Sequence, residues 1–201
     1  ELLIKCDFSK KEDIDKCFQE ISAKWKSIDF IIHAVAFSDK TELNGPYIKT
    51  SKENFINTLN VSCYSFTKIA YLFSSLMTNG GSLVTLTFYG SKKVMPCYNV
   101  MGVAKAALET SVKYLSVDLG NKNIRVNAIS AGPMRTLSGA VIGKSREVYK
   151  YTQENSPLRR NVSLEEIGNT ATYLVSNMSG AVTGEVHYVD CGFNIMGMTR
   201  F

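Results

Sequence analysis

The sequence predicts a doubly wound α/β fold built on a parallel sheet. Short apolar runs alternate with segments in which apolar residues recur every three or four positions, the pattern of strands alternating with helices. One run, IDFIIHAVAF (28–37), reads as continuously apolar, as expected of a strand buried on both faces. Successive βαβ units place helices on both faces of such a sheet. We expect one domain over 1–201.

The elements follow in order along the chain. The apolar start, ELLIKCDF (1–8), reads as a strand, and Ser9 and Glu12 then have the spacing of a helix capping box. After the 28–37 run we expect a helical span over about 51–77, a strand at 81–88 and a helix that carries Tyr98 and Lys105. The remaining elements are a strand at 124–130, a loop AGPMRT, a helical region, a second capping-box helix at 163–176 and a last strand at 184–190.

The glycine-rich turn typical of dinucleotide-binding folds is missing. No strand is followed by a G-x-G-x-x-G-like turn, and the chain begins without Met inside what reads as a strand. We therefore expect a chain truncated at its front. The first βα units, about 50 to 60 residues at roughly 30 per βαβ motif, would precede Glu1 and contain the loop that binds a cofactor pyrophosphate.

Composition argues against several other classes of protein. No apolar run is long enough to cross a bilayer, and the first residues lack the order of a signal peptide, so we expect a cytoplasmic protein with no membrane partner. The net charge of +5 is spread over mixed patches, which disfavours nucleic-acid binding. Five scattered cysteines without a C-x-x-C motif, and a lone His33, suggest reduced thiols and no metal site: Cys6, Cys17, Cys63, Cys97 and Cys191.

Tyr98 and Lys105 stand seven positions apart in PCYNVMGVAK (96–105). On a helix, positions i and i+7 are about 20° out of alignment and roughly 10 Å apart along the axis, so both side chains can line one groove. Taken alone, the pair is equally compatible with a core tyrosine and a solvated lysine, because both residue types are common. Ligands of parallel sheets bind beyond the carboxyl ends of the strands, which adds 7–8, 34–38, 88–89 and 130–136 to the candidate site.

Several stretches together resemble the short-chain dehydrogenase/reductase superfamily and, within it, the bacterial NADH-dependent enoyl-acyl-carrier-protein reductases. They are CDF, HAVAFSDK, NVSCYSF, LTFYGSKKVMPCYNVMGVAKAALE, IRVNAISAGPMRT and PLRRNVSLEEIGNTATYL. The Tyr-x6-Lys spacing is similar to that of enoyl reductases, whereas typical carbonyl reductases of the superfamily have Tyr-x3-Lys. The resemblance implies a Rossmann-type fold, NADH as cofactor with NADPH not excluded, acyl carrier protein as partner and a homotetramer.

The resemblance also implies roles for individual residues. Tyr98 would donate a hydrogen bond to the thioester oxygen as hydride reaches the β-carbon, and Lys105 would hold the nicotinamide ribose. The implied cofactor-binding residues are Asp7, Phe8, Val35, Lys105, Met134, Arg135, Thr136, Leu137 and Ser138. The implied substrate-binding residues are Ser38, Phe88, Tyr98, Met101, Val141 and Ile142.

Some of these assignments have plain structural alternatives. Asp7 is equally a turn residue after a strand, and AGPMRT can be an ordinary strand-to-helix turn. Many bacterial relatives have a second active-site tyrosine where this chain has Phe88, which cannot donate a hydrogen bond. We expect a mobile lid at 137–155, whose basic residues Lys144, Arg146 and Lys150 form either a docking face for acyl carrier protein or a solvated surface.

Two other functions stay open at this point. One is a short-chain carbonyl or 3-ketoacyl reductase, which the Tyr-x6-Lys spacing and Phe88 disfavour. The other is a non-catalytic fragment or scaffold without its pyrophosphate loop. Activity on crotonyl thioesters against 3-ketoacyl thioesters, and dinucleotide binding, would separate the three.

Overall fold

The computed structural model describes residues 1–136 and 143–198 and is built around one parallel sheet. Its strands are β1 (Phe30–His33), β2 (Gly81–Thr87), β3 (Ile124–Ala131) and β4 (Val186–Val189). They lie side by side in the order β1-β2-β3-β4, and every neighbouring pair is parallel. The carboxyl ends of all four strands therefore point to the same edge of the sheet.

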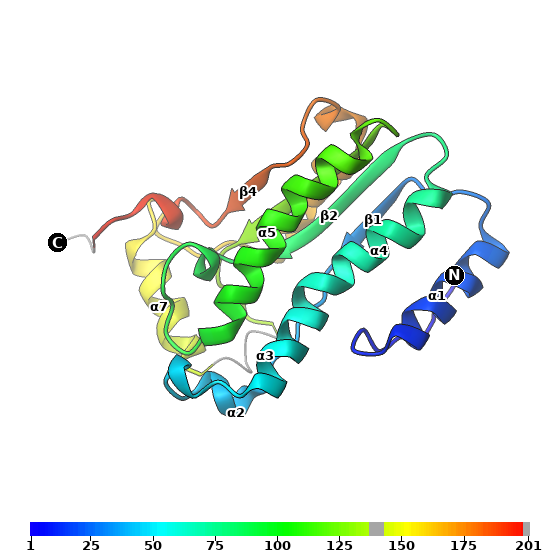
Figure 1. The fold of residues 1–201 in the computed structure, drawn as a ribbon. Helices are drawn as coiled ribbons and strands as arrows, with labels where there is room; N and C mark the ends of the chain where they lie inside the picture. The colour runs from blue at the N-terminus through cyan, green and yellow to red at the C-terminus, as the bar shows by residue number, and fades with distance from the viewer. Residues whose placement is uncertain (137–142, 199–201) are drawn as a thin grey trace.

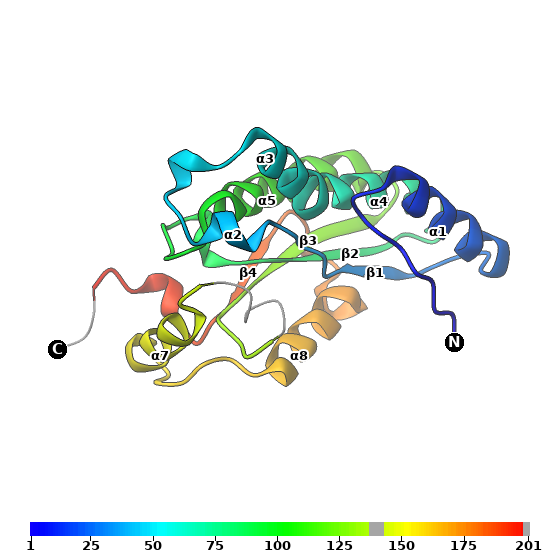
Figure 2. The ribbon, with the colours of Figure 1, turned by 90° about the horizontal axis from the view of Figure 1, so that it is seen from below.

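Helices cover both faces of this sheet, which confirms the predicted doubly wound α/β fold (Figures 1 and 2). One face carries α1 (Lys11–Lys24), α3 (Lys52–Leu59), α4 (Ser65–Phe73) and α5 (Asn99–Gly120), with the short α2 (Lys40–Leu43). The other face carries α7 (Ser145–Asn155) and α8 (Leu164–Val175). Single turns complete the described chain: η1 (Tyr47–Lys49), η2 (Asn60–Tyr64), η3 (Ser74–Leu76), η4 (Tyr89–Ser91), η5 (Asn177–Ser179) and η6 (Phe193–Ile195).

The core consists of two main apolar layers, one on each face of the sheet. Side chains alternate along a strand, so Leu83 of β2 packs with Leu108 and Val112 of α5, while its neighbour Val84 packs with Leu174 of α8. All of these side chains are fully buried, and each contributes about 1.5–3 kcal/mol through the hydrophobic effect. The position of α5 against the sheet is thus fixed by packing along its whole length.

The predicted first strand is not formed. Residues 1–7 pair with no strand among the described residues, because a strand requires a neighbour that accepts and donates its backbone hydrogen bonds. Cys6 and Phe8 instead pack on the apolar cluster under α1 and α4. The expectation that the next strand is buried on both faces is also wrong, since Phe30 and Ile32 of β1 are 50% and 45% exposed.

Of the two predicted capping boxes, one forms and one does not. The Ser163 hydroxyl accepts from the amide of Glu166, whose carboxylate accepts from the Ser163 amide, so α8 begins as predicted. Helix α1 begins after Lys10 without a side-chain cap. Ser9 is not available there, because its amide and its hydroxyl both donate to the carboxylate of Asp7.

The predicted helical span over about 51–77 is confirmed as an almost continuous run from α3 to η3. Its middle turn, η2, is a π-helix, a rare geometry that tends to occur near functional sites. Ser51 caps the run by accepting from the amide of Asn54. Neither this run nor any other helix in the described part of the chain combines the length and apolar character that a membrane span requires.

Candidate active site

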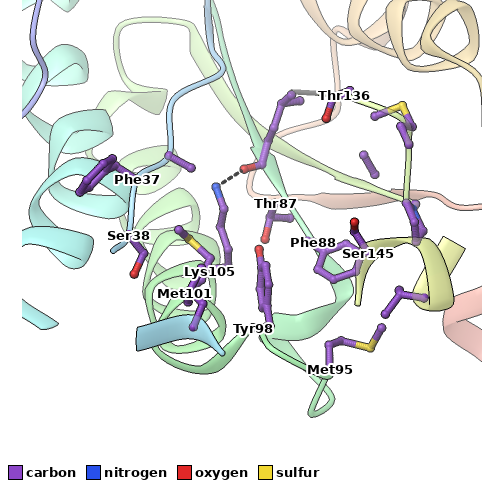
Figure 3. Close-up of a pocket in the computed structure, with 18 of the residues that line it drawn as sticks. Phe37, Ser38, Thr87, Phe88, Met95, Tyr98, Met101, Lys105, Thr136 and Ser145 are labelled. Atoms are coloured by element: carbon purple, nitrogen blue, oxygen red, sulfur yellow. Dashed lines mark hydrogen bonds between the residues drawn. The ribbon is translucent and has the colours of Figure 1, made fainter. Parts of the chain in front are cut away.

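A cavity of about 730 Å³ opens at the carboxyl ends of β1, β2 and β3 (Figure 3). Its walls come from the segments that follow these three strands, from the first two turns of α5 and from the start of α7. The lining is mostly apolar, and Tyr98 and Lys105 both belong to it. A cavity therefore lies at the sheet edge that the sequence predicted as the ligand site.

Tyr98 caps the amino end of α5 and is only 5% exposed. Its ring packs edge-on against Phe88, with 5.0 Å between the ring centroids, and its hydroxyl points into the cavity (Figure 3). Gly90 makes this position possible, because a Cβ atom there would lie 2.4 Å from the tyrosine ring. Burial, and secondarily the negative charge of Glu109, raise the pKa of Tyr98, so the side chain is a neutral O–H donor across the physiological range.

Lys105 lies two turns further along α5 and is 6% exposed. Its Nζ donates a hydrogen bond of 2.8 Å to the carbonyl oxygen of Leu86, at the end of β2 (Figure 3). Burial lowers the pKa of Lys105 to about 8, while the negative charge of Glu109 acts in the opposite direction. The ammonium group is thus a buried cation that loses its proton at mildly alkaline pH.

The backbone around Tyr98 is unusual. Its two neighbours, Cys97 and Asn99, have positive φ angles of 56° and 42°. Residues other than glycine rarely adopt this backbone conformation. The side-chain amide of Asn99 donates to the carbonyl oxygens of Leu43 and Gly45, at 3.1 and 2.7 Å, and so compensates for this strain. The turn that presents Tyr98 is therefore anchored to the end of α2 and to the residues that follow it.

His33 lies beneath the cavity and serves as a structural group, as predicted from its isolation in the sequence. The Ser65 hydroxyl donates to the carbonyl of Val61, so we infer that its oxygen accepts from His33 Nε2, 2.8 Å away. The other ring nitrogen lies 3.0 Å from the Thr85 hydroxyl. Burial, together with the charge of Lys105, lowers the pKa of His33 to about 4, which keeps the imidazole neutral.

Most of the predicted site residues that the structure describes come together in this cavity. The lining includes Val35, Ser38, Phe88, Tyr98, Met101, Lys105, Met134 and Thr136. Four predicted residues, Leu137, Ser138, Val141 and Ile142, lie outside the described residues. The second part of the predicted lid is helix α7, and its residues Ser145, Val148 and Tyr149 line the cavity.

Three predicted cofactor-binding residues do not line the cavity. The guanidinium of Arg135 lies over the ring of Tyr149, 4.9 Å from its centroid, in a cation–π contact. Asp7 is a turn residue, the structural alternative to a cofactor contact: its carboxylate accepts hydrogen bonds from the amide and the hydroxyl of Ser9. The ring of Phe8 packs edge-on against His33. Contacts of Asp7, Phe8 and Arg135 with a cofactor stay predictions.

The sequence did not single out Glu109, although it belongs to the same environment. Its carboxylate is 1% exposed and accepts hydrogen bonds from Thr87, at 2.8 Å, and from Ser91. Lys92 pairs with it, with 3.0 Å between Nζ and Oε2. Its position in the sequence could have indicated this. Glu109 follows Lys105 by four residues, and residues four apart lie on the same face of a helix.

The geometry combines a neutral phenol, a buried cation and a largely apolar cavity. A phenol O–H aimed into a site from which water is largely excluded can stabilise an oxyanion that develops on a bound carbonyl group. The small side chains of Ala34 and Ala36 allow an extended ligand to approach the backbone after β1 closely, and Thr136 adds a polar group at the opposite wall. These features fit a dinucleotide beside an acyl substrate.

Comparison with known proteins identifies the family. A family model described as "Enoyl-(Acyl carrier protein) reductase" matches residues 1–194. "Enoyl-[acyl-carrier-protein] reductase [NADH] 1" of Rhizobium meliloti is 56% identical over 193 residues, 96% of this chain and 71% of that protein. The enoyl-(acyl-carrier-protein) reductase of Anaplasma phagocytophilum in complex with NAD is 52% identical, with a TM-score of 0.96 over 100% of this chain and 77% of that one.

A third similar protein bears a different cofactor. The Bacillus cereus enoyl-acyl carrier protein reductase, solved with NADP+ and an indole naphthyridinone, is 43% identical, with a TM-score of 0.95 over 98% of this chain and 77% of that one. Both the family model and these identities extend over nearly the whole chain. The chain therefore belongs to the enoyl-(acyl carrier protein) reductase family.

Proposed function

We propose that this chain reduces the trans-2 double bond of enoyl-acyl-carrier-protein thioesters with NADH, the last step of a fatty-acid elongation cycle. The observation that carries this proposal is the Tyr98–Lys105 pair, with the Tyr-x6-Lys spacing, in one cavity at the carboxyl ends of the strands. Relatives that are 50–56% identical over nearly the whole chain bear this activity in their names.

In this proposal Tyr98 is the group that acts on the substrate. NADH supplies the hydride that reaches the β-carbon, and negative charge then develops on the thioester oxygen. The phenol of Tyr98 donates a hydrogen bond to that oxygen, which stabilises the enolate without the residue being ionised. Phe88 has no hydroxyl, so Tyr98 acts alone, and Phe88 supports its ring through the edge-on contact.

Lys105 has a separate role on the cofactor side. As a compact cation with three donors, it would hold the ribose hydroxyls next to the nicotinamide, and its positive charge favours the enolate electrostatically. The hydrogen bond from Nζ to the carbonyl oxygen of Leu86, a residue that lines the cavity, supports this role (Figure 3). Val35, Met134 and Thr136 would complete the cofactor wall, and Ser38 and Met101 the substrate wall.

The preference for NADH can be tested directly. The curated relatives are named for NADH, whereas the Bacillus cereus structure holds NADP+. Initial rates at matched concentrations of NADH and NADPH decide between them. A higher kcat/KM with NADPH would overturn the NADH assignment and leave the enoyl reductase assignment intact.

The decisive assay is NADH oxidation followed at 340 nm with crotonyl-CoA or crotonyl-acyl-carrier protein. We expect turnover that falls by about 10²-fold or more in Tyr98→Phe, since one oxyanion donor is lost. Tyr89→Phe is the matched control, because the ring of Tyr89 packs against Tyr188 and Phe193 and does not line the cavity. Turnover on 3-ketoacyl thioesters instead would identify a carbonyl reductase.

Acyl carrier protein would dock beside α7. Lys144, Arg146 and Lys150 are exposed on this helix and its cap, while Ser145 and Val148 face the cavity. Basic side chains at a cavity mouth steer an acidic carrier by charge, an effect that salt screens. Reversing two of them, Lys144→Glu and Arg146→Glu, should raise KM for crotonyl-acyl-carrier protein while leaving KM for crotonyl-CoA nearly unchanged. We further propose that helix α7, the described part of the predicted lid, covers the substrate.

The homotetramer implied by the resemblance would use the outer faces of α4 and α5. These helices lie side by side on one face of the molecule (Figure 1) and expose large side chains, among them Tyr71, Tyr114 and Val117. An apolar patch of this kind is typical of an interface. Val117→Glu should dissociate the oligomer in light scattering after size exclusion, whereas Val94→Glu, on an exposed loop, should not.

A further inference from the structure

Glu109 is a carboxylate buried below the cavity, and its partners come from two other segments. Thr87, at the end of β2, donates to Oε1 at 2.8 Å, and Ser91 of the η4 turn donates to the same oxygen. Lys92 lies 3.0 Å from Oε2 and leads to the surface, since its side chain is half-exposed. A buried charge is tolerated only when it is paired and hydrogen-bonded in this way.

These partners enclose the segment that holds the ring of Tyr98. Between Thr87 and Ser91 lie Phe88, which packs edge-on against Tyr98, and Gly90, whose missing Cβ leaves room for the ring. Hydrogen bonds to the Glu109 carboxylate therefore hold both ends of the segment 87–91 against α5. A shift of the segment by a fraction of an ångström would move the phenol with it.

Glu109 also belongs to the same helix face as the Tyr98–Lys105 pair. At 100° per residue, positions 105 and 109 lie about 20° to either side of position 98, so the three side chains form one stripe along α5. The negative charge of Glu109 raises the pKa of Tyr98 and that of Lys105, although burial is the larger influence on each.

Other titratable groups face the same region. His33 of β1 and Cys63 of η2 lie near Lys105. Tyr188 of β4 lies near Glu109 and Lys92. His33 is neutral, and burial keeps the Cys63 thiol protonated by raising its pKa. Among these described neighbours, Lys92 is the cation that partly offsets the charge of Glu109.

We propose that Glu109 is a positioning residue for the reduction: it fixes the Tyr98 ring through Thr87 and Ser91, and it places a negative charge on the helix face that carries Lys105. The expected effect on turnover rests on the proposed function, since Glu109 is assigned to the same site. The expected effect on the pKa of Lys105 does not depend on that function. Lys92 weakens the electrostatic effect of Glu109 on Lys105, because its ammonium group is paired with the same carboxylate.

The test is Glu109→Gln, which removes the charge and keeps an oxygen that can accept from Thr87 and Ser91. A 13C NMR titration of lysine side chains, with Lys105 assigned through Lys105→Arg, measures the pKa without any turnover. We expect the pKa of Lys105 to fall below its value of about 8 in Glu109→Gln, because a negative charge on the same helix face is lost. The alkaline limb of kcat/KM for crotonyl-CoA should move to lower pH by the same amount.

Two further variants complete the test. Lys92→Gln should raise the pKa of Lys105, because it removes the cation that is paired with the carboxylate, while Thr87 and Ser91 still donate to Glu109. Asp118→Asn, an equal charge change at an exposed position of α5, should leave that pKa unchanged. An unchanged Lys105 pKa in Glu109→Gln, or in Lys92→Gln if the former does not fold, overturns the inference. Absence of enoyl turnover in the wild type overturns only the proposed function.

Discussion

Gly90→Ala should disable the enzyme without unfolding it. An ideal Cβ at residue 90 would lie 2.4 Å from Cδ1 and 2.7 Å from Cε1 of Tyr98, whereas carbon atoms in contact stay about 3.5–4.0 Å apart. The ring must therefore move by roughly 1 Å, a misplacement that costs about 10²-fold in rate. The backbone itself tolerates alanine, because Gly90 is not among the glycines with positive φ.

The assay is kcat/KM for crotonyl-CoA from NADH oxidation at 340 nm, with circular dichroism to confirm the fold. Gly168→Ala is the control, since a Cβ there meets nothing within 4 Å. In a Tyr98→Phe background, Gly90→Ala should cost little more, because the hydroxyl that it misplaces is already gone. Folded Gly90→Ala protein with wild-type kcat/KM would refute the argument that this close approach sets the position of Tyr98.

Three further outcomes are expected. The activity should be lost as pH rises through about 8, where Lys105 gives up its proton; a pH profile that is flat to pH 10 would contradict this. Ser163→Ala should cost about 1 kcal/mol of unfolding free energy in urea, through loss of the α8 cap, and Ser9→Ala, which caps no helix, clearly less. The pKa of His33 is about 4 in the folded protein and 6.5 in the unfolded chain. The unfolding free energy should therefore decrease by up to about 3 kcal/mol as the pH falls from 6.5 toward 4. An equal decrease in His33→Asn would rule this out.

Local sequence signals predicted the elements well where the partners were also local. The Ser163–Glu166 capping box formed because both of its members are free to bond each other. Ser9 and Glu12 have the same spacing, but Asp7 competes for the serine hydroxyl and amide, a contact that the spacing alone does not reveal. The predicted first strand failed for a related reason, since pairing depends on a neighbour elsewhere in the chain.

The candidate site divides in the same way. The helical repeat placed Tyr98 and Lys105 on one groove, and strand ends predicted Val35, Ser38 and Phe88 at its walls; all five line the cavity. The same argument was wrong for Asp7, Phe8 and Tyr89, which do not line it. Contacts between distant segments were invisible. The hydrogen bonds that surround Glu109, and the packing of Gly90 against the tyrosine ring, arise only when β2, η4 and α5 come together. Sequence spacing gives the face of a helix, but not what packs against it.

The parallel sheet also determines when the protein becomes active as it folds. Hydrogen bonds at the sheet join distant residues: Thr85 of β2 donates to His33 of β1, 52 positions away, and Glu185, just before β4, donates to Asn127 of β3, 58 positions away. Sheets with such long-range pairing form slowly, because the entropy of closing long loops is lost before their contacts are gained. The cavity draws on the ends of three of these strands, so it exists only after all three have paired. Recovery of turnover after dilution from urea should therefore follow the slowest folding phase, later than the return of helical circular dichroism.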